Sequence, residues 1–160
     1  MAATLKFRRK KEGKTDYGTR MNLLKSKDPR IVIRKSNKYI IAQLIKSSEA
    51  QDSTICAVNS KELSSFDWPS SFKNVPAAYA TGILLAKKAK EEDIQKCTVD
   101  IGRYTSTPGS KIYAVVKGAK DAGLDINCPD KMLPKESRLL GEHTKNPEKI
   151  KKLIEKIRKQ

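Results

Sequence analysis

The excess of positive charge in this chain is confined to its two ends, and this distribution most limits what the chain can fold into. Residues 1–38 carry 13 Lys and Arg against 3 Asp and Glu, and residues 131–160 carry 10 against 4. The 92 residues between them hold 11 of each sign. Such asymmetry predicts a globular body flanked by basic segments. We expect a basic arm and short helix over 1–28, a mixed α/β core over 29–130 and a basic helical extension over 131–160.

The composition narrows the class of protein. A formal charge of +16 exceeds what solubility requires and indicates a polyanionic partner. Hydrophobic residues form 38% of the chain, which is enough for a core and excludes full disorder. No run of 18 apolar residues occurs, so no membrane contact is expected. One His and three well-separated Cys spell out neither a zinc site nor a disulfide framework, so we expect no metal, no cofactor and a reducing, cytoplasmic setting.

Three runs rich in β-branched residues, 31–34, 39–45 and 53–58, predict an antiparallel meander. The middle run is apolar on both faces near its centre, which indicates a central strand. The residues between the first two runs predict a tight hairpin, in which Asn37 would tolerate a positive φ.

Two helices with a strand between them are expected next. Asn74 and Pro76 are typical of a helix start, and this helix should run to about Glu92, with Gly82 in close contact with the sheet. A buried strand follows at 96–101, and a second helix should begin at Ser110 and end at Gly123. A meander followed by helix, strand and helix predicts an α/β (α+β) fold with a mixed sheet.

Both ends of the chain have their own character. Residues 1–14 hold too few apolar side chains to fold alone, so we expect a mobile arm. After it, the spacing of Tyr17, Met21 and Leu24 predicts a short amphipathic helix, capped by Thr15 or Asp16, that docks the arm. Near the other end, Asn146-Pro147 begins a helix whose apolar stripe needs a partner surface: Ile150, Leu153, Ile154 and Ile157.

Residues suited to catalysis are sparse. His143 is the only histidine and lies in a polar stretch, while Asp100 stands alone at the end of its strand, so no catalytic set is expected. The loop before the second helix offers small hydroxyls and free amides at a helix N-terminus. Thr107 and Ser110 in this loop suit one backbone phosphate, but plain helix capping explains them equally well.

Four long segments resemble a known family in the same order: FRRKKEGKTDYGTRMNLLKSKDPRIVIRKSNKYIIAQLI at 7–45, NVPAAYATGILLAKKA at 74–89, VDIGRYTSTPGSKIYAVVKGAKDAGLDI at 99–126 and RLLGEH at 138–143. The family is the archaeal-type 5S-rRNA-binding protein of the large ribosomal subunit, universal ribosomal protein L-eighteen, whose eukaryotic counterpart is L-five. The resemblance implies a ribonuclease H-like topology without catalysis. It also implies a structural role in binding 5S rRNA and anchoring it in the central protuberance.

The resemblance assigns RNA-binding residues position by position. The matching residues of the arm are Arg8, Arg9, Lys10, Lys11, Lys14, Thr15, Tyr17 and Arg20. The hairpin and the following strand add Arg34, Lys35, Ser36, Asn37, Lys38 and Gln43. The implied partners are 5S rRNA, 23S-type rRNA and the neighbouring 5S-binding ribosomal protein, with no homo-oligomer. Two other functions stay open at this point: a ribonuclease H-like RNA-processing nuclease and an RNA-binding regulator outside the ribosome.

Overall fold

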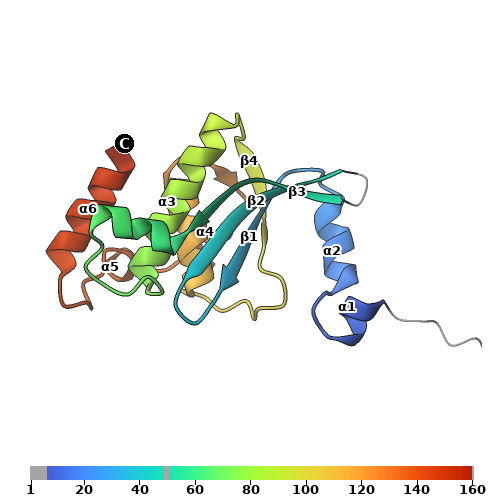
Figure 1. Cartoon of the computed structure of the whole chain (residues 1–160), viewed down its shortest axis with the longest axis horizontal. Coiled ribbons are helices and arrows are strands. Elements are labelled where there is room, and N and C mark those ends of the chain that lie inside the picture. Colours follow the sequence, from blue (N-terminus) through green and yellow to red (C-terminus); the bar gives the residue numbers. More distant parts are fainter. Residues whose placement is uncertain (1–6, 49–50, 160) are drawn as a thin grey trace, which may run out of the picture.

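The computed structural model describes residues 7–48 and 51–159, and its centre is one mixed five-stranded sheet (Figure 1). The strands are β1 (Arg30–Lys35), β2 (Ile40–Ser48), β3 (Gln51–Asn59), β4 (Lys96–Asp100) and β5 (Asp125–Ile126), in the order β3-β2-β1-β4-β5. The first three strands pair antiparallel, whereas β4 runs parallel to both β1 and β5. The α+β fold with its meander is therefore confirmed, and β2 is an inner strand as expected.

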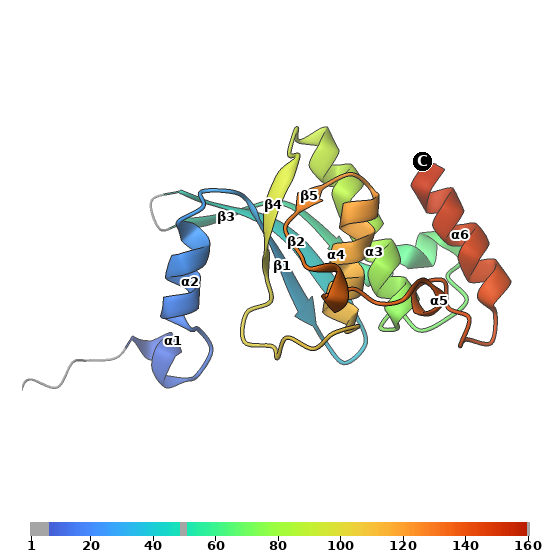
Figure 2. The same cartoon turned by 180° about the vertical axis from the view of Figure 1, so that it is seen from behind.

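Helices α3 (Val75–Glu91) and α4 (Lys111–Asp121) cover one face of this sheet (Figure 2). Asn74 caps α3 as predicted, because its side-chain oxygen accepts a hydrogen bond of 2.8 Å from the Ala77 amide. The residues of β1 and β2 that face these helices, Ile31, Ile33, Ile40, Ala42 and Leu44, are fully buried. The core therefore lies between the sheet and the two helices.

Gly82 brings α3 close to α4, and our expectation that it contacts the sheet is wrong. A Cβ on Gly82 would lie 2.1 Å from the carbonyl oxygen of Val115, and one on Gly118 would lie 2.1 Å from that of Tyr79. Each helix thus places a glycine against the backbone of the other, since only the absence of a side chain permits this separation.

The opposite face of the sheet, which we call the open face, has no pair of long helices over it. Arg30, Val32 and Arg34 of β1 lie on this face, beside Ile41, Gln43 and Ile45 of β2 in the antiparallel register. The three β2 residues are only half-buried. The predicted central position of β2 is therefore confirmed, although only the face toward the helices is fully buried.

Helix α2 (Tyr17–Leu24) and the single turn α1 (Arg8–Lys11) project from one end of the sheet (Figure 1). Asp16 caps α2 as predicted, but Met21 is 67% exposed, so the docking stripe does not include it. Residues 1–6 of the expected mobile arm lie outside the described residues. The arm also differs from the expectation in forming α1, where the Phe7 and Tyr17 rings lie 5.2 Å apart and Arg9 donates to Thr15.

Three of the remaining elements lie at the far end of the molecule from the arm: the 3-10 turn η1 (Ser60–Phe66), α5 (Glu136–Leu139) and α6 (Pro147–Lys159). The 3-10 turn η2 (Asp130–Met132) lies beside α4 (Figure 2). Helix α6 packs on α3, and its Ile150, Ile154 and Ile157 are buried (Figure 2). Arg158 of α6 donates to the hydroxyl of Tyr79 and lies 3.6 Å from Asp121. The apolar stripe of the C-terminal segment therefore has its partner within the chain.

Candidate nucleic-acid interface

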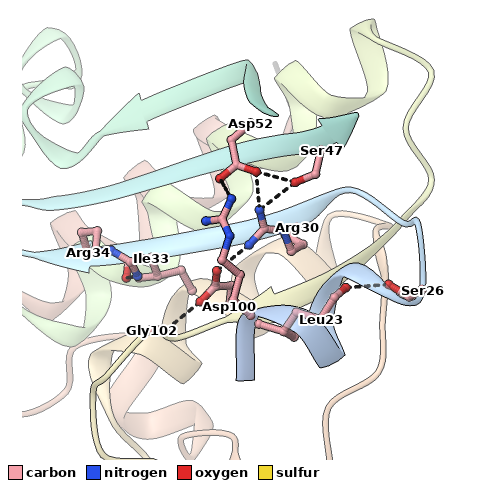
Figure 3. A network of polar contacts seen from close by, with 10 residues as sticks. Leu23, Ser26, Arg30, Ile33, Arg34, Ser47, Asp52, Asp100 and Gly102 are labelled. Atoms are coloured by element: carbon pink, nitrogen blue, oxygen red, sulfur yellow. Dashed lines mark hydrogen bonds and ion pairs between the residues drawn. The ribbon is translucent and has the colours of Figure 1, made fainter. Parts of the chain in front are cut away.

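A buried arginine on the open face joins the sheet to the arm (Figure 3). Arg30 is 2% exposed and donates hydrogen bonds of 2.9 Å each to Asp100, Ser47 and Asp52. The other carboxylate oxygen of Asp52 accepts from Arg20 of α2 at 2.7 Å. Because Asp52 bridges the two arginines, this charged network fixes α2 at the end of the sheet.

The same network explains the protonation state of Asp52. Burial alone raises the pKa of this carboxyl group, but hydrogen bonds from Ser47 and Arg20 and the charges of Arg20 and Arg30 outweigh that effect. The pKa of Asp52 is therefore held below its ordinary value, and the carboxylate stays ionised as the bridge requires.

Asp100 is part of this network and does not stand alone, which corrects the expectation from the sequence. One of its oxygens accepts from Arg30, and the other accepts from the amide of Gly102 at 2.8 Å. Gly102 adopts a φ of +61°, and a Cβ there would lie 3.0 Å from the Arg34 guanidinium. Asp100 thus fixes the turn that carries Arg103 and Tyr104, while Gly102 leaves space for Arg34.

A groove lies between the arm, the end of β1 and this turn, and we call it the arm groove. One pocket within it has a volume of about 100 Å³. The basic side chains that line it come from three separate segments: Arg9, Lys14, Arg20, Arg34 and Arg103. Lys10, Gly13 and Tyr104 line the hollows that adjoin it. Only Asp16 and Asp100 contribute negative charge to the groove among the described residues, so its potential is positive.

The arm keeps its shape through short-range contacts. Asp16 accepts from the amides of Gly18 and Thr19, and its hydrogen bond with the Thr19 hydroxyl, the largest effect, lowers its pKa. Glu12 pairs with Arg8 at 3.2 Å and with Lys14 at 2.8 Å. These exposed pairs stabilise little. Their geometry is therefore easily exchanged for contacts with a stronger anion such as phosphate.

The hairpin of residues 34–38 projects beside the same groove. Ser36 closes its turn, since the Ser36 hydroxyl accepts from the Tyr39 amide at 2.9 Å and the Ser36 amide donates to the Tyr39 carbonyl. Asn37 tolerates a positive φ but does not adopt one, because the loop is wide enough not to need it. The ammonium group of Lys35 lies 4.6 Å from the centre of the Tyr104 ring, a cation–π contact that holds the hairpin to the neighbouring turn.

Ser110 begins α4 at the predicted position, but its hydroxyl makes no capping hydrogen bond. The amides expected to be free are used: Gly109 donates to the Met132 carbonyl at 3.0 Å and Ser110 to the Thr107 carbonyl at 3.3 Å. Thr107 itself is exposed in the loop. The loop therefore offers side chains rather than a row of free amides to a ligand.

The structure brings some of the predicted residues together but not all of them into one pocket. Six of them line the arm groove or its adjoining hollows: Arg9, Lys10, Lys14, Thr15, Arg20 and Arg34. Others lie outside it. Arg8, Lys11 and Lys38 are exposed, Tyr17 packs on Phe7, and Gln43 lies half-buried on the open face.

Sequence reasoning missed Arg103 and Tyr104, which join the arm and the hairpin. A basic–aromatic pair directly after a buried strand, preceded by a glycine, was the available signal. No group of three His, Cys, Asp or Glu side chains that could hold a metal occurs within 7–48 and 51–159. In the same described ranges no helix is both long and apolar enough to cross a membrane.

An α+β body with a positive groove at one end of its sheet defines a protein that binds a polyanion. Residues 3–95 match the model of a family described as ribosomal large subunit proteins 60S L5 and 50S L18. The chain belongs to this family. It is 49% identical over 139 residues to large ribosomal subunit protein uL18 of Korarchaeum cryptofilum, which covers 87% of the chain and 71% of that relative.

Two further archaeal relatives carry the same name. The uL18 protein of Methanococcus maripaludis is 44% identical over 155 residues, covering 96% of the chain and 80% of the relative. That of Halobacterium salinarum is 44% identical over 137 residues, covering 86% and 75% respectively. The family is a structural, non-enzymatic one, so the chain is not an enzyme.

Proposed function

We propose that this chain is a structural constituent of the large ribosomal subunit that binds 5S rRNA and helps to anchor it in the central protuberance. Membership of the family supports the ribosomal role and a cytoplasmic location in the large subunit. The observation that carries RNA binding is the arm groove. Its five cations come from the arm, the sheet and the turn after β4, and the Arg30 network fixes all three segments.

The arm and the hairpin contribute differently to this binding. The hairpin is attached to a rigid sheet, so its cations reach phosphates at little entropic cost. The arm lies at the edge of the molecule, where its short helical turn can enter an RNA groove that the body cannot (Figure 1). Both release counterions from the RNA, and 23S-type rRNA and the neighbouring 5S-binding ribosomal protein are the further partners that we propose.

The two alternative functions are less well supported. A nuclease of this topology needs several carboxylates that converge on metal ions. In Asp100, however, one carboxylate oxygen accepts from Arg30 and the other from the Gly102 amide. The family is also non-enzymatic. An RNA-binding regulator would remain outside ribosomes, so co-sedimentation of the chain with large subunits separates it from our proposal.

Charge removal at the hairpin tests RNA binding directly. Changing Arg34, Lys35 and Lys38 to Gln should weaken the affinity for 5S rRNA at least about tenfold, because it removes three positive charges that the rigid hairpin presents to the RNA. Circular dichroism should stay unchanged. The matched control changes Lys149, Lys152 and Lys156 to Gln, three exposed cations of α6, and should bind within about twofold of the parent protein. Equal affinity of the two variants would show that the hairpin faces solvent.

A further inference from the structure

A second basic pocket, which we call the lysine pocket, opens on the other side of the hairpin from the arm groove. Its volume is about 440 Å³. Four cations line it, each from a different segment: Lys35 of the hairpin, Lys73 before α3, Lys111 at the start of α4 and Arg138 of α5. Tyr104, which contacts Lys35, lines both this pocket and the hollows of the arm groove.

The four cations have no acidic partner. Among residues 7–48 and 51–159, none of their side chains forms an ion pair or donates a hydrogen bond, although Lys73 and Lys111 are half-buried. By contrast, Lys117 and Lys120 on the same helix α4 pair with Asp121 and Asp130. Burial, followed by the charges of Lys73 and Lys35, lowers the pKa of Lys111. Like charges held together without a counter-charge are unfavourable unless an anion joins them.

Ser110 supplies an independent sign that a ligand belongs in this pocket. Its hydroxyl oxygen is buried and, in the described part of the chain, has no hydrogen-bond partner. A serine at this position ordinarily accepts from an amide of the first helical turn, but this one does not. The residue lines the pocket at the N-terminus of the eleven-residue helix α4, where the helix dipole favours a negative charge.

We propose that the lysine pocket binds one phosphodiester of rRNA, at a site distinct from the arm groove. The inference rests on the proposed function: RNA that binds in the arm groove continues past the Lys35–Tyr104 contact into the lysine pocket. Lys73 and Lys111 neutralise the phosphate, and Lys35 and Arg138 approach it from the rim. The Ser110 hydroxyl, which is buried and unpartnered in the free protein, rotates toward the pocket and donates a hydrogen bond to one of the phosphate oxygens. The pocket is open to the surface, which suits a phosphate within a chain.

Charge removal in the pocket is the first test. The double variant Lys73→Gln/Lys111→Gln is compared with the control Lys149→Gln/Lys152→Gln, which removes the same charge from exposed positions of α6. Each is titrated separately with 5S rRNA and with 23S-type rRNA. The pocket variant should bind at least one RNA about three- to tenfold more weakly, with a salt slope shallower by roughly 1. The control should match the parent protein.

Two outcomes separate this inference from the proposed function. If the hairpin variant loses 5S rRNA affinity while the pocket variant matches its control on both RNAs, the lysine pocket is overturned and the proposed function stands. If neither the hairpin nor the arm affects 5S rRNA binding, the proposed function fails, while a loss of 23S-type rRNA affinity in the pocket variant still supports the pocket.

The Ser110→Ala variant tests the hydroxyl. Because that group is buried without a partner, its removal should leave the melting temperature unchanged or raised, while the affinity for RNA falls roughly three- to tenfold. A lower melting temperature with unchanged affinity would make Ser110 a plain helix cap and overturn its role. Inorganic phosphate is the second probe: if it shifts the Ser110 and Lys111 amide NMR signals but RNA does not, the pocket is a small-ion site and the inference fails.

Discussion

At the scale of single residues, the carboxylates that pair with Arg30 matter more for stability than other acidic residues do, because the charge of Arg30 is buried. Side chains of Arg30 and Asp100 are 3% and 12% exposed, and Asp52 is the only other carboxylate on Arg30 among the described residues. Removing one partner of a buried pair is costly because the remaining charge stays desolvated. Asp100→Asn should therefore lower the free energy of unfolding by about 3 kcal/mol in urea denaturation.

Asp130→Asn is the matched control for this substitution. Asp130 pairs with Lys120 at 3.3 Å, but its side chain is 87% exposed, so its loss should cost less than about 1 kcal/mol. Equal effects of the two substitutions would mean that Asp100 does not balance the charge of Arg30.

At the scale of elements, the contact between α3 and α4 depends on Gly82. A Cβ at this position would lie 2.1 Å from a backbone oxygen of Val115, and a backbone atom cannot rotate away as a side chain can. Gly82→Ala should therefore lower the free energy of unfolding by at least about 3 kcal/mol, measured by thermal or urea denaturation.

Gly18→Ala provides the opposite case within the same chain. Gly18 lies in α2 with a negative φ, and the nearest atom to its Cβ would be an Asp16 oxygen at 3.4 Å. Alanine there should raise the free energy of unfolding by about 0.5–1 kcal/mol, because it restricts the unfolded chain and favours the helix. If both substitutions stabilised the protein, α3 and α4 would not be in backbone contact.

The elements themselves follow from local patterns in the sequence, whereas the contacts between them do not. The caps at Asp16 and Asn74, the three strands of the meander and the stripe of α6 were predictable because each depends on neighbouring residues. The partner of Gly82 was not predictable, since a glycine permits close approach to a helix as readily as to a sheet. The contact between α6 and α3 was likewise not predictable, because it joins segments that lie far apart in the sequence.

The candidate site shows the same division. A resemblance pointed to the cations of the arm and hairpin, but Arg103, Tyr104, Lys73 and Lys111 became visible only when the fold joined separate segments. Asp100 illustrates why: its partner Arg30 is 70 residues away in the sequence. No local pattern predicts such a pair, and only the parallel pairing of β1 with β4 brings the two side chains together.

At the scale of the whole molecule, the arm lies at the opposite end from α6 (Figure 1). The two basic ends of the chain therefore present their charges at different places on the surface. Helix α6 buries its apolar stripe on α3, and its cations spread over the outer side of the body. The arm instead places its cations around a groove. We therefore expect the salt dependence of RNA binding to reside mainly in the N-terminal end.

Deleting residues 1–14 tests this expectation, with deletion of residues 1–6 as the control. The longer deletion also removes Arg8, Arg9, Lys10, Lys11 and Lys14, whereas residues 1–6 hold only one cation. For duplex DNA each neutralised phosphate contributes about −0.9 to the slope of log K against log salt, which serves as a guide for RNA. If three to five of these cations contact phosphates, the slope for 5S rRNA should become shallower by roughly 3 to 4. The control should change it by less than about 1. An equal slope for both deletions would refute the role of residues 7–14, because their charge would then be as solvated in the complex as in the free protein.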